Sequence, residues 1–176
     1  QRNKPDMNFF RQLVLVETTI TRPTDTTAYA AGDIIGTTTD AGTSTSVFTF
    51  TNAARANAIG GVVASVMMID SVNAATNIDC DIFFFNTTLA QQADNVAFAA
   101  TDAEMATCIG VVSIVGTDGK ESSNNIAYNG IMPSPGNIPF VPDSASRNIF
   151  AVIVVRNAYT PASGEIFRVR TWIYQA

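Results

Sequence analysis

Three aspartates are the residues of this chain whose types and spacing come nearest to catalytic chemistry. Asp79 and Asp81 lie two positions apart in the run IDCDIFFF, and Asp70 ends the preceding apolar run GVVASVMMID. A carboxylate pair can act as the acid and base of a glycosidase where an apolar site separates the two pKa values, and carboxylates also bind calcium. With Asp70 placed on a neighbouring strand, we interpret all three as solvated carboxylates, with a glycosidase pair and calcium binding as the alternatives.

The chain contains no histidine. This removes the commonest general base, the commonest zinc ligand and every Ser-His-Asp or Cys-His arrangement. The glycine-bracketed segment AGDIIG lacks the spacing of a phosphate-binding loop, so we interpret it as a plain turn. We therefore expect a protein that is not an enzyme and that holds no cofactor and no metal ion.

The last apolar run, EIFRVRTWIYQA, predicts a strand with Arg168, Arg170, Trp172 and Tyr174 on one face. Aromatic rings beside arginines stack on a sugar or fill a protein contact. We favour packing in the core or against another subunit. The complete set of candidate subunit or capsid contacts is Phe9, Phe10, Pro139, Phe140, Trp172 and Tyr174.

The composition restricts the classes of partner. Charged residues make up 14% of the 176 residues, and the net charge is -5, with lysine only at Lys4 and Lys120. Nucleic-acid affinity comes from clustered Lys and Arg, so we expect no nucleic-acid partner. A surface so poor in charge fits a large, permanently assembled contact surface, and equally fits the ordinary Thr/Ser bias of β proteins.

The length and the apolar runs indicate one domain. We divide the chain into an N-terminal arm at 1–10 and a single domain at 11–176. No apolar run is long enough to cross a membrane as a helix, so we expect no membrane partner. Cys80 and Cys108 both lie inside apolar strand patterns and are interpreted as buried free thiols.

The elements that must position these residues are strands. Ile78 to Phe85 alternates as a half-buried strand, but Phe83 and Phe85 place rings on the face of Asp79 and Asp81. Such a strand must be covered on both faces, by a second sheet, a loop or a neighbouring subunit. One short helix is expected near Thr101, with Glu104 in capping-box reach and Met105 pointing inward.

The proline-rich segment and the number of expected strands indicate the fold class. The prolines between 133 and 142 exclude both a helix and a central strand, and indicate an extended loop. Eight to ten short strands and almost no helix predict an all-β, antiparallel two-sheet sandwich of jelly-roll type. An immunoglobulin-like sandwich is the alternative, although its paired cysteines with an intervening tryptophan are absent.

The order of several segments resembles a known family. YAAGDIIG, GVVASVMMID, DIFFFNTT and ADNVAFAATDAEMATCIGVVSI follow one another between Tyr29 and Val115. They resemble tailed-bacteriophage capsid decoration proteins, also called cement or auxiliary proteins. The resemblance implies a jelly-roll-like subunit, commonly a homotrimer, that binds the major capsid protein on the outside of the head and stabilises the shell. It implies location in the virion, at the capsid surface.

Two further functions stay open beside this expectation. A phage tail or fibre structural protein would share the low charge and the strands that are apolar on both faces. A carbohydrate-binding β-sandwich would use Trp172 and Tyr174 as the surface on which a sugar stacks.

Overall fold

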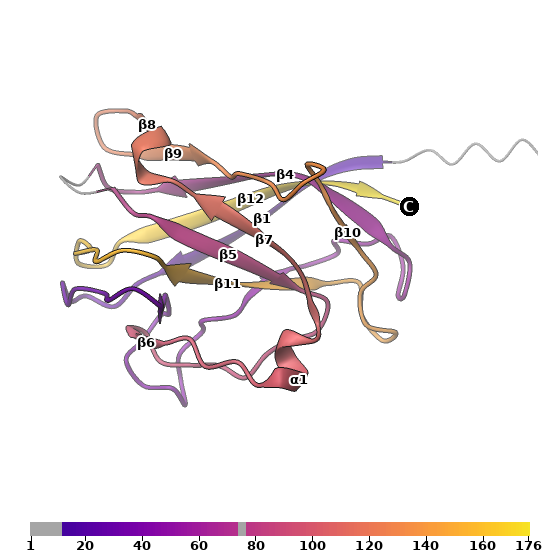
Figure 1. Ribbon diagram of the computed structural model, residues 1–176, viewed down its shortest axis with the longest axis horizontal. Coiled ribbons are helices and arrows are strands. Elements are labelled where there is room, and N and C mark those ends of the chain that lie inside the picture. The colour runs from indigo at the N-terminus through magenta and orange to yellow at the C-terminus, as the bar shows by residue number, and fades with distance from the viewer. Residues whose placement is uncertain (1–11, 74–76) are drawn as a thin grey trace, which may run out of the picture.

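Residues 12–73 and 77–176 are described by a computed structural model, in which two antiparallel sheets pack face to face (Figure 1). The predicted arm at 1–10, with Phe9 and Phe10, lies outside the described residues. Sheet I consists, in spatial order, of β1 (Gln12–Thr21), β12 (Ile166–Gln175), β4 (Gly61–Asp70), β9 (Ile126–Asn129) and β8 (Lys120–Glu121), with β10 (Ile138–Phe140) beside β4.

Sheet II contains the remaining strands. In spatial order they are β6 (Val96–Ala97), β2 (Asp33–Ile34), β11 (Ile149–Val155), β5 (Cys80–Phe85) and β7 (Cys108–Ile114), with β3 (Phe48–Phe50) beside β11. The two helical elements are α1 (Asp102–Met105) and the 3-10 turn η1 (Gly116–Asp118). The predicted all-β two-sheet sandwich is confirmed.

The strand order is that of a jelly roll. β2 and β3 lie end to end, and both pair with the same side of β11. β9 and β10 are arranged in the same way along β4. With each of these pairs counted as one strand and the two-residue strands β6 and β8 left out, sheet I runs first, eighth, third, sixth and sheet II runs second, seventh, fourth, fifth. Apart from the fourth and fifth strands, neighbours in each sheet are not consecutive in sequence, as the Greek-key connections of a jelly roll require.

The core lies between the sheets because alternate side chains point inward from each. Phe84 of β5 and Phe50 of β3 contact each other there, with ring centroids 5.6 Å apart. Cys80 is buried in this core and Cys108 is half-buried, and both are free thiols, as predicted. In the part of the chain that the structure describes, no helix is long and apolar enough to cross a membrane.

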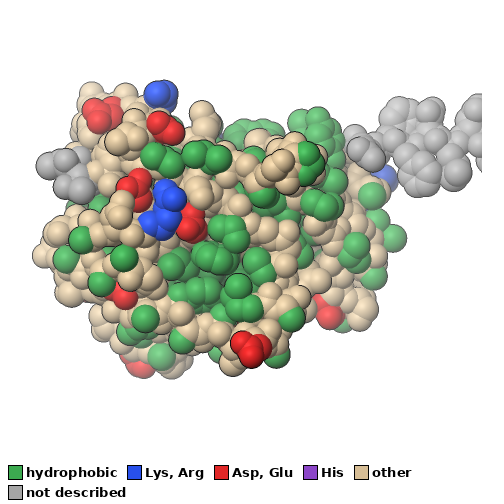
Figure 2. Space-filling view, in the orientation of Figure 1, with side chains coloured by type: hydrophobic (Ala, Val, Ile, Leu, Met, Phe, Trp, Pro, Cys, Tyr) green, Lys and Arg blue, Asp and Glu red, His purple; other side chains and the backbone are tan. Residues whose placement is uncertain are grey.

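The outer face of sheet II is covered by the chain's own residues. Phe85 is fully buried among Ile34, Val47 and Leu89, and Phe83 packs against Phe98 with ring centroids 5.7 Å apart. In Figure 1 the segment that carries β6 and α1 lies below sheet II, and Figure 2 shows that this segment leaves some hydrophobic side chains over β5 and β11 at the surface. The cover that the Phe83 and Phe85 pattern predicts is therefore largely a loop of the same chain.

The short helix and the proline-rich segment follow their local signals. Thr101 caps α1, and its hydroxyl and the carboxylate of Glu104 form the predicted capping box. Met105, however, is exposed rather than inward-pointing, because a single helical turn on the outside of sheet II has no core beneath it. Pro139 lies in the three-residue strand β10 at the edge of sheet I, where its missing N–H breaks no central ladder.

Candidate functional site

The outer face of sheet I is the candidate functional surface. Strand β12 buries Phe167, Val169, Thr171 and Ile173 and turns Arg168, Arg170, Trp172 and Tyr174 outward, as the alternation predicts. Because β1 pairs with β12 in continuous register, Leu13 lies beside Tyr174 and Leu15 beside Trp172. The sequence therefore identified the face on which these aromatic side chains lie.

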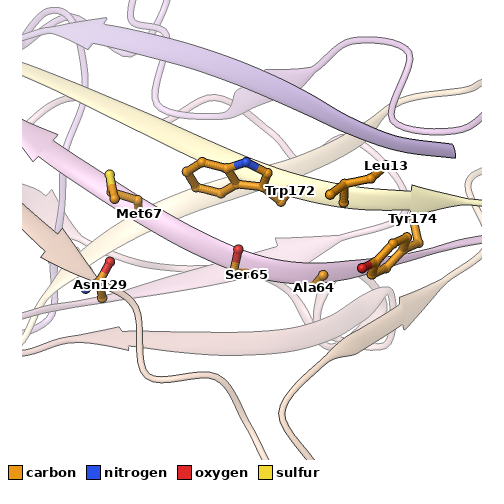
Figure 3. Close-up of a pocket in the computed structure, with 7 residues that line it drawn as sticks. All are labelled: Leu13, Ala64, Ser65, Met67, Asn129, Trp172 and Tyr174. Carbon is orange, nitrogen blue, oxygen red and sulfur yellow. The ribbon is translucent and has the colours of Figure 1, made fainter.

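This face carries an apolar strip, which we define as Leu13, Leu15, Met67, Trp172 and Tyr174. Leu13 and Leu15 are each 50% exposed, Tyr174 is 40% exposed, and Trp172 is half-buried. Figure 3 shows the indole of Trp172 between Met67 on one side and Leu13 on the other. A strand face that leaves such large apolar side chains in contact with water is typical of a surface that another molecule covers.

A shallow groove runs along the strip. It is lined by Leu13, Ala64, Ser65, Met67, Asn129, Trp172 and Tyr174. Trp172 pairs with Ser65 of β4, whereas Ile173 pairs with Val63, so Ala64 is an extra residue that forms a β-bulge. The bulge and the small side chains of Ala64 and Ser65 leave the space that forms the groove beside the indole.

The other end of the same face is charged. Glu17 of β1 lies opposite Arg170, whose Nε is 2.5 Å from Glu17 Oε2, and Arg168 Nε is 3.3 Å from Glu17 Oε1. Both arginines are partly exposed, so these pairs add little to the free energy of folding. Their effect is to give the face one apolar end and one polar end.

The other candidate contacts have different environments. Pro139 is exposed on edge strand β10. Phe140 is only 4% exposed, because its ring fills the space above Gly61, where a Cβ would lie 2.7 Å from the ring. The Phe140 side chain therefore belongs to this chain's own core and leaves almost no surface for a partner.

The three aspartates do not form one site. Asp79 and Asp81 do share the outer face of sheet II, where Asp79 accepts from Gly116 N at 2.6 Å and Asp81 accepts from Ser113 Oγ at 2.7 Å. Asp70 is in sheet I and points into the core, so the expectation of a neighbouring solvated strand position is wrong. Within residues 12–73 and 77–176, no group of three or more His, Cys, Asp or Glu side chains is placed to hold a metal ion.

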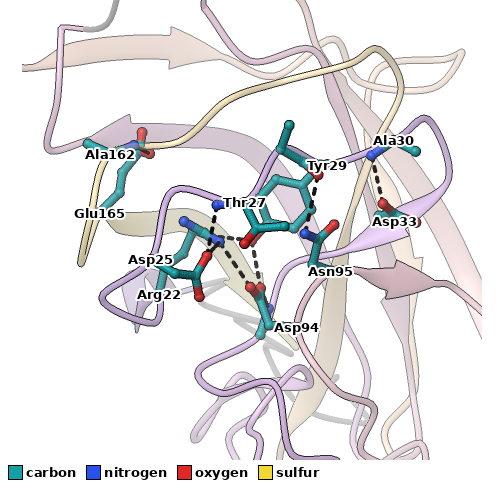
Figure 4. Close-up of polar contacts among 12 residues, drawn as sticks. Arg22, Asp25, Thr27, Tyr29, Ala30, Asp33, Asp94, Asn95, Ala162 and Glu165 are labelled. Atoms are coloured by element: carbon teal, nitrogen blue, oxygen red, sulfur yellow. Dashed lines mark hydrogen bonds and ion pairs between the residues drawn. The ribbon is translucent and has the colours of Figure 1, made fainter.

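A buried ion pair that the sequence analysis missed joins distant segments. The guanidinium of Arg22 and the carboxylate of Asp94 are both fully buried, with Nη2 3.0 Å from Oδ2 (Figure 4). Asp94 Oδ1 also accepts from the hydroxyl of Tyr29 at 2.6 Å and from Gly36 N at 2.7 Å. A buried charge is tolerated only where such partners satisfy it.

This network connects two of the segments that carry the family resemblance. Tyr29 and Gly36 begin and end YAAGDIIG, and Asp94 belongs to ADNVAFAATDA. The next residue, Asn95, donates from Nδ2 to Ala28 O at 3.2 Å, and Asp33 accepts from Ala30 N at 2.6 Å (Figure 4). In this chain Tyr29, Gly36 and Asp94 therefore hold buried segments of the fold together.

A second buried cluster lies next to the first. The ring of Tyr159 stacks on that of Tyr29 with centroids 6.5 Å apart, and the Tyr159 hydroxyl donates to Glu165 Oε1. Glu165 is buried together with Asp70. Burial, followed by the hydrogen bond with Glu165 and its charge, raises the pKa of Asp70 to about 8.

Comparisons with known proteins add little to this geometry. No protein-family model matches the chain, and no curated protein matches it. One solved structure that the chain is similar to is titled "Structure of a marine algae virus of the order Picornavirales". The match has 9% identity and a TM-score of 0.24, and it covers 94% of this chain and 69% of that one. A TM-score this low supports no argument, so the class of the protein rests on its own strands, as a jelly-roll β-sandwich.

Replacing Asp94 by Ala is expected to destabilise the fold strongly. The change leaves the buried Arg22 guanidinium without its carboxylate, which costs about 3–5 kcal/mol of unfolding free energy. Asp25 is a matched control, since its carboxylate is 3.7 Å from the same guanidinium but its side chain is 34% exposed. Chemical denaturation should give less than about 1 kcal/mol for Asp25→Ala, and equal losses for the two variants would contradict the assignment.

The raised pKa of Asp70 predicts that the protein loses stability as the pH rises. Asp70 keeps its proton up to about pH 8 in the folded state and releases it near 3.8 when unfolded. At Asp70 the folded state therefore holds a proton that the unfolded state lacks between these values, and this group lowers the unfolding free energy by at most ~1.4 kcal/mol per pH unit across them. Asp70→Asn should flatten that slope in denaturation curves measured from pH 4 to 8. Parallel curves for the two proteins would disprove the buried, protonated carboxyl.

Proposed function

We propose that this chain is a virion structural protein that decorates the outside of a bacteriophage head and stabilises the shell. The observation that carries the proposal is the exposed apolar strip on sheet I. The apolar outer face of sheet II is largely covered by the chain's own loop, whereas Leu13, Leu15 and Tyr174 stay exposed. Permanent contacts bury apolar surfaces of this kind, because the interfaces of obligate oligomers resemble the hydrophobic core of a domain cut in half.

The fold and the sequence resemblance support the same proposal. Jelly rolls occur in viral capsid proteins and also in lectins, so the fold alone does not choose between those functions. The segments between Tyr29 and Val115 that resemble decoration proteins favour the capsid. The partners that we propose are further copies of this chain, as a homotrimer in the form that the resemblance implies, and the major capsid protein.

The proposed mechanism is mechanical, without catalysis. A subunit that bridges neighbouring shell proteins adds modest contacts at many positions, and avidity multiplies them. Asp70, Asp79 and Asp81 are divided between two sheets, and the chain has no histidine to act as a general base. These observations support the proposal that the protein is not an enzyme and needs no cofactor.

The direct test is binding of the purified protein to empty shells of its major capsid protein, measured by co-sedimentation. The wild-type protein should bind saturably and raise the temperature at which the shells open. A Leu13→Ser/Leu15→Ser variant should bind at least about tenfold more weakly, because exposed apolar contacts are lost with little effect on folding.

Val96 provides the matched control, since it is a 40%-exposed apolar side chain in β6 of sheet II. Val96→Ser should bind as the wild type does. Absence of wild-type binding would overturn the decoration role. Equal weakening by Leu13→Ser/Leu15→Ser and by Val96→Ser would show that the apolar strip is not the contact with the shell.

The groove beside Trp172 favours carbohydrate binding as the second candidate function. An exposed tyrosine and a half-buried tryptophan lie there beside the polar side chains of Ser65 and Asn129 (Figure 3). If this groove binds a sugar, a glycan array should give signals that Trp172→Ala abolishes and Val96→Ser preserves. An array without signal for the wild-type protein would eliminate this alternative.

A further inference from the structure

One sheet edge differs from all the others. Strand β1 pairs with β12 along its ten residues and, within residues 12–73 and 77–176, with no other strand. Exposed edges promote pairing with another chain, so folded proteins shorten them, cover them or interrupt them with bulges, proline or lysine. β1 has none of these protections: its register is continuous and its one charged residue is Glu17.

The other sheet edges in the described part of the chain are shorter or irregular. β3, β6, β8 and β10 have only two or three residues each, β8 contains Lys120, and β10 contains Pro139. β7 is longer, but its pairing with β5 contains a register shift. Ile131 also pairs with Ser113, near one end of β7, through two backbone hydrogen bonds at 2.8 and 3.2 Å. The long open edge at β1 is therefore a specific feature of the fold.

The direction of the backbone groups on β1 follows from two contacts. Thr171 Oγ1 donates to Val16 O at 3.1 Å, and Arg22 N donates to Glu165 O at 2.9 Å, so even-numbered residues face β12. In an antiparallel pair the residues alternate in direction. The N–H and C=O groups of Leu13, Leu15, Glu17 and Thr19 consequently point toward the open edge, and none of them has a backbone partner among the described residues.

We propose that β1 pairs antiparallel with β1 of a second copy of this chain, so that sheet I continues across a two-fold axis. A partner that covers ten extended residues must itself offer an open edge of that length, and β1 is the strand of the described chain that does so. Pairs with two-fold symmetry are also the commonest kind of homo-oligomer.

Charge and strand direction fix the register. The outward-facing residues are odd-numbered, so odd residues must lie opposite odd residues. Axes at Val16 and at Glu17 pair the most residues of β1, but an axis at Glu17 would place two equal charges opposite each other, which is unfavourable. An axis at Val16 avoids this and sets Leu13 opposite Thr19 of the second copy and Leu15 opposite its Glu17. Both copies then present their apolar strips on the same side of one continuous sheet.

Hydrogen exchange tests this contact in the wild-type protein. As the protein concentration rises and the solution mass becomes that of two chains or an even multiple, the amides of Leu13, Leu15, Glu17 and Thr19 should become at least about tenfold more protected. Unprotected amides in these four residues at every concentration, or an assembly with an odd number of chains, would overturn the proposal.

A matched pair of variants separates the edge from the apolar strip. Thr19 is exposed at the charged end of β1, away from the strip. Thr19→Pro removes an outward N–H and should raise the dissociation constant of the pair at least about tenfold, whereas Thr19→Ala keeps the N–H and should change it less than about threefold.

Equal effects of the two Thr19 variants would also overturn the proposal. If Thr19→Pro fails to fold, hydrogen exchange of the wild-type protein decides alone. The pairing is compatible with the proposed homotrimer only where three pairs form an assembly of six chains, so a three-chain assembly would overturn the pairing and leave the trimer standing. Shell binding is measured separately.

Discussion

The buried carboxylate of Asp94 connects sheet I, sheet II and the segment that covers the outer face of sheet II. Asp94 belongs to the segment that covers sheet II, Arg22 follows the edge strand of sheet I, and Tyr29 and Gly36 lie on either side of β2 in sheet II. Because every partner of the buried charge must be in place at once, the pair fixes how these segments lie relative to one another. The remaining architecture depends on that constraint, since it holds the covering segment against sheet II.

The consequence is an asymmetry between the two outer faces. On sheet II, Phe85 is fully buried and Phe83 rests against Phe98. On sheet I, the face formed by β1, β12 and β4 keeps a strip of leucine and aromatic side chains exposed, beside the open edge of β1. The chain thus encloses most of its apolar surface on the sheet II side and presents a strip of it on the sheet I side. A protein that is assembled permanently with its neighbours is the simplest physical explanation for the exposed side.

Local pattern predicted the strands and the direction of their side chains well. Trp172 and Tyr174 face outward and Thr101 caps a helix with Glu104 because both features depend on spacing within a few residues. The same reasoning failed for Asp70, since its position at the end of an apolar run says nothing about the buried Glu165 that lies beside it. It also missed the pair of Arg22 and Asp94, which are 72 positions apart and meet only through the order of the strands.

The central claim is that the outer face of sheet I is buried in an assembled particle. A cryo-EM reconstruction of the virion tests it most directly. We expect density for this jelly roll on the outside of the shell, with Leu13, Leu15 and Trp172 covered by a neighbouring subunit. A particle without this chain, or one in which that face is open to solvent in every copy, would contradict it.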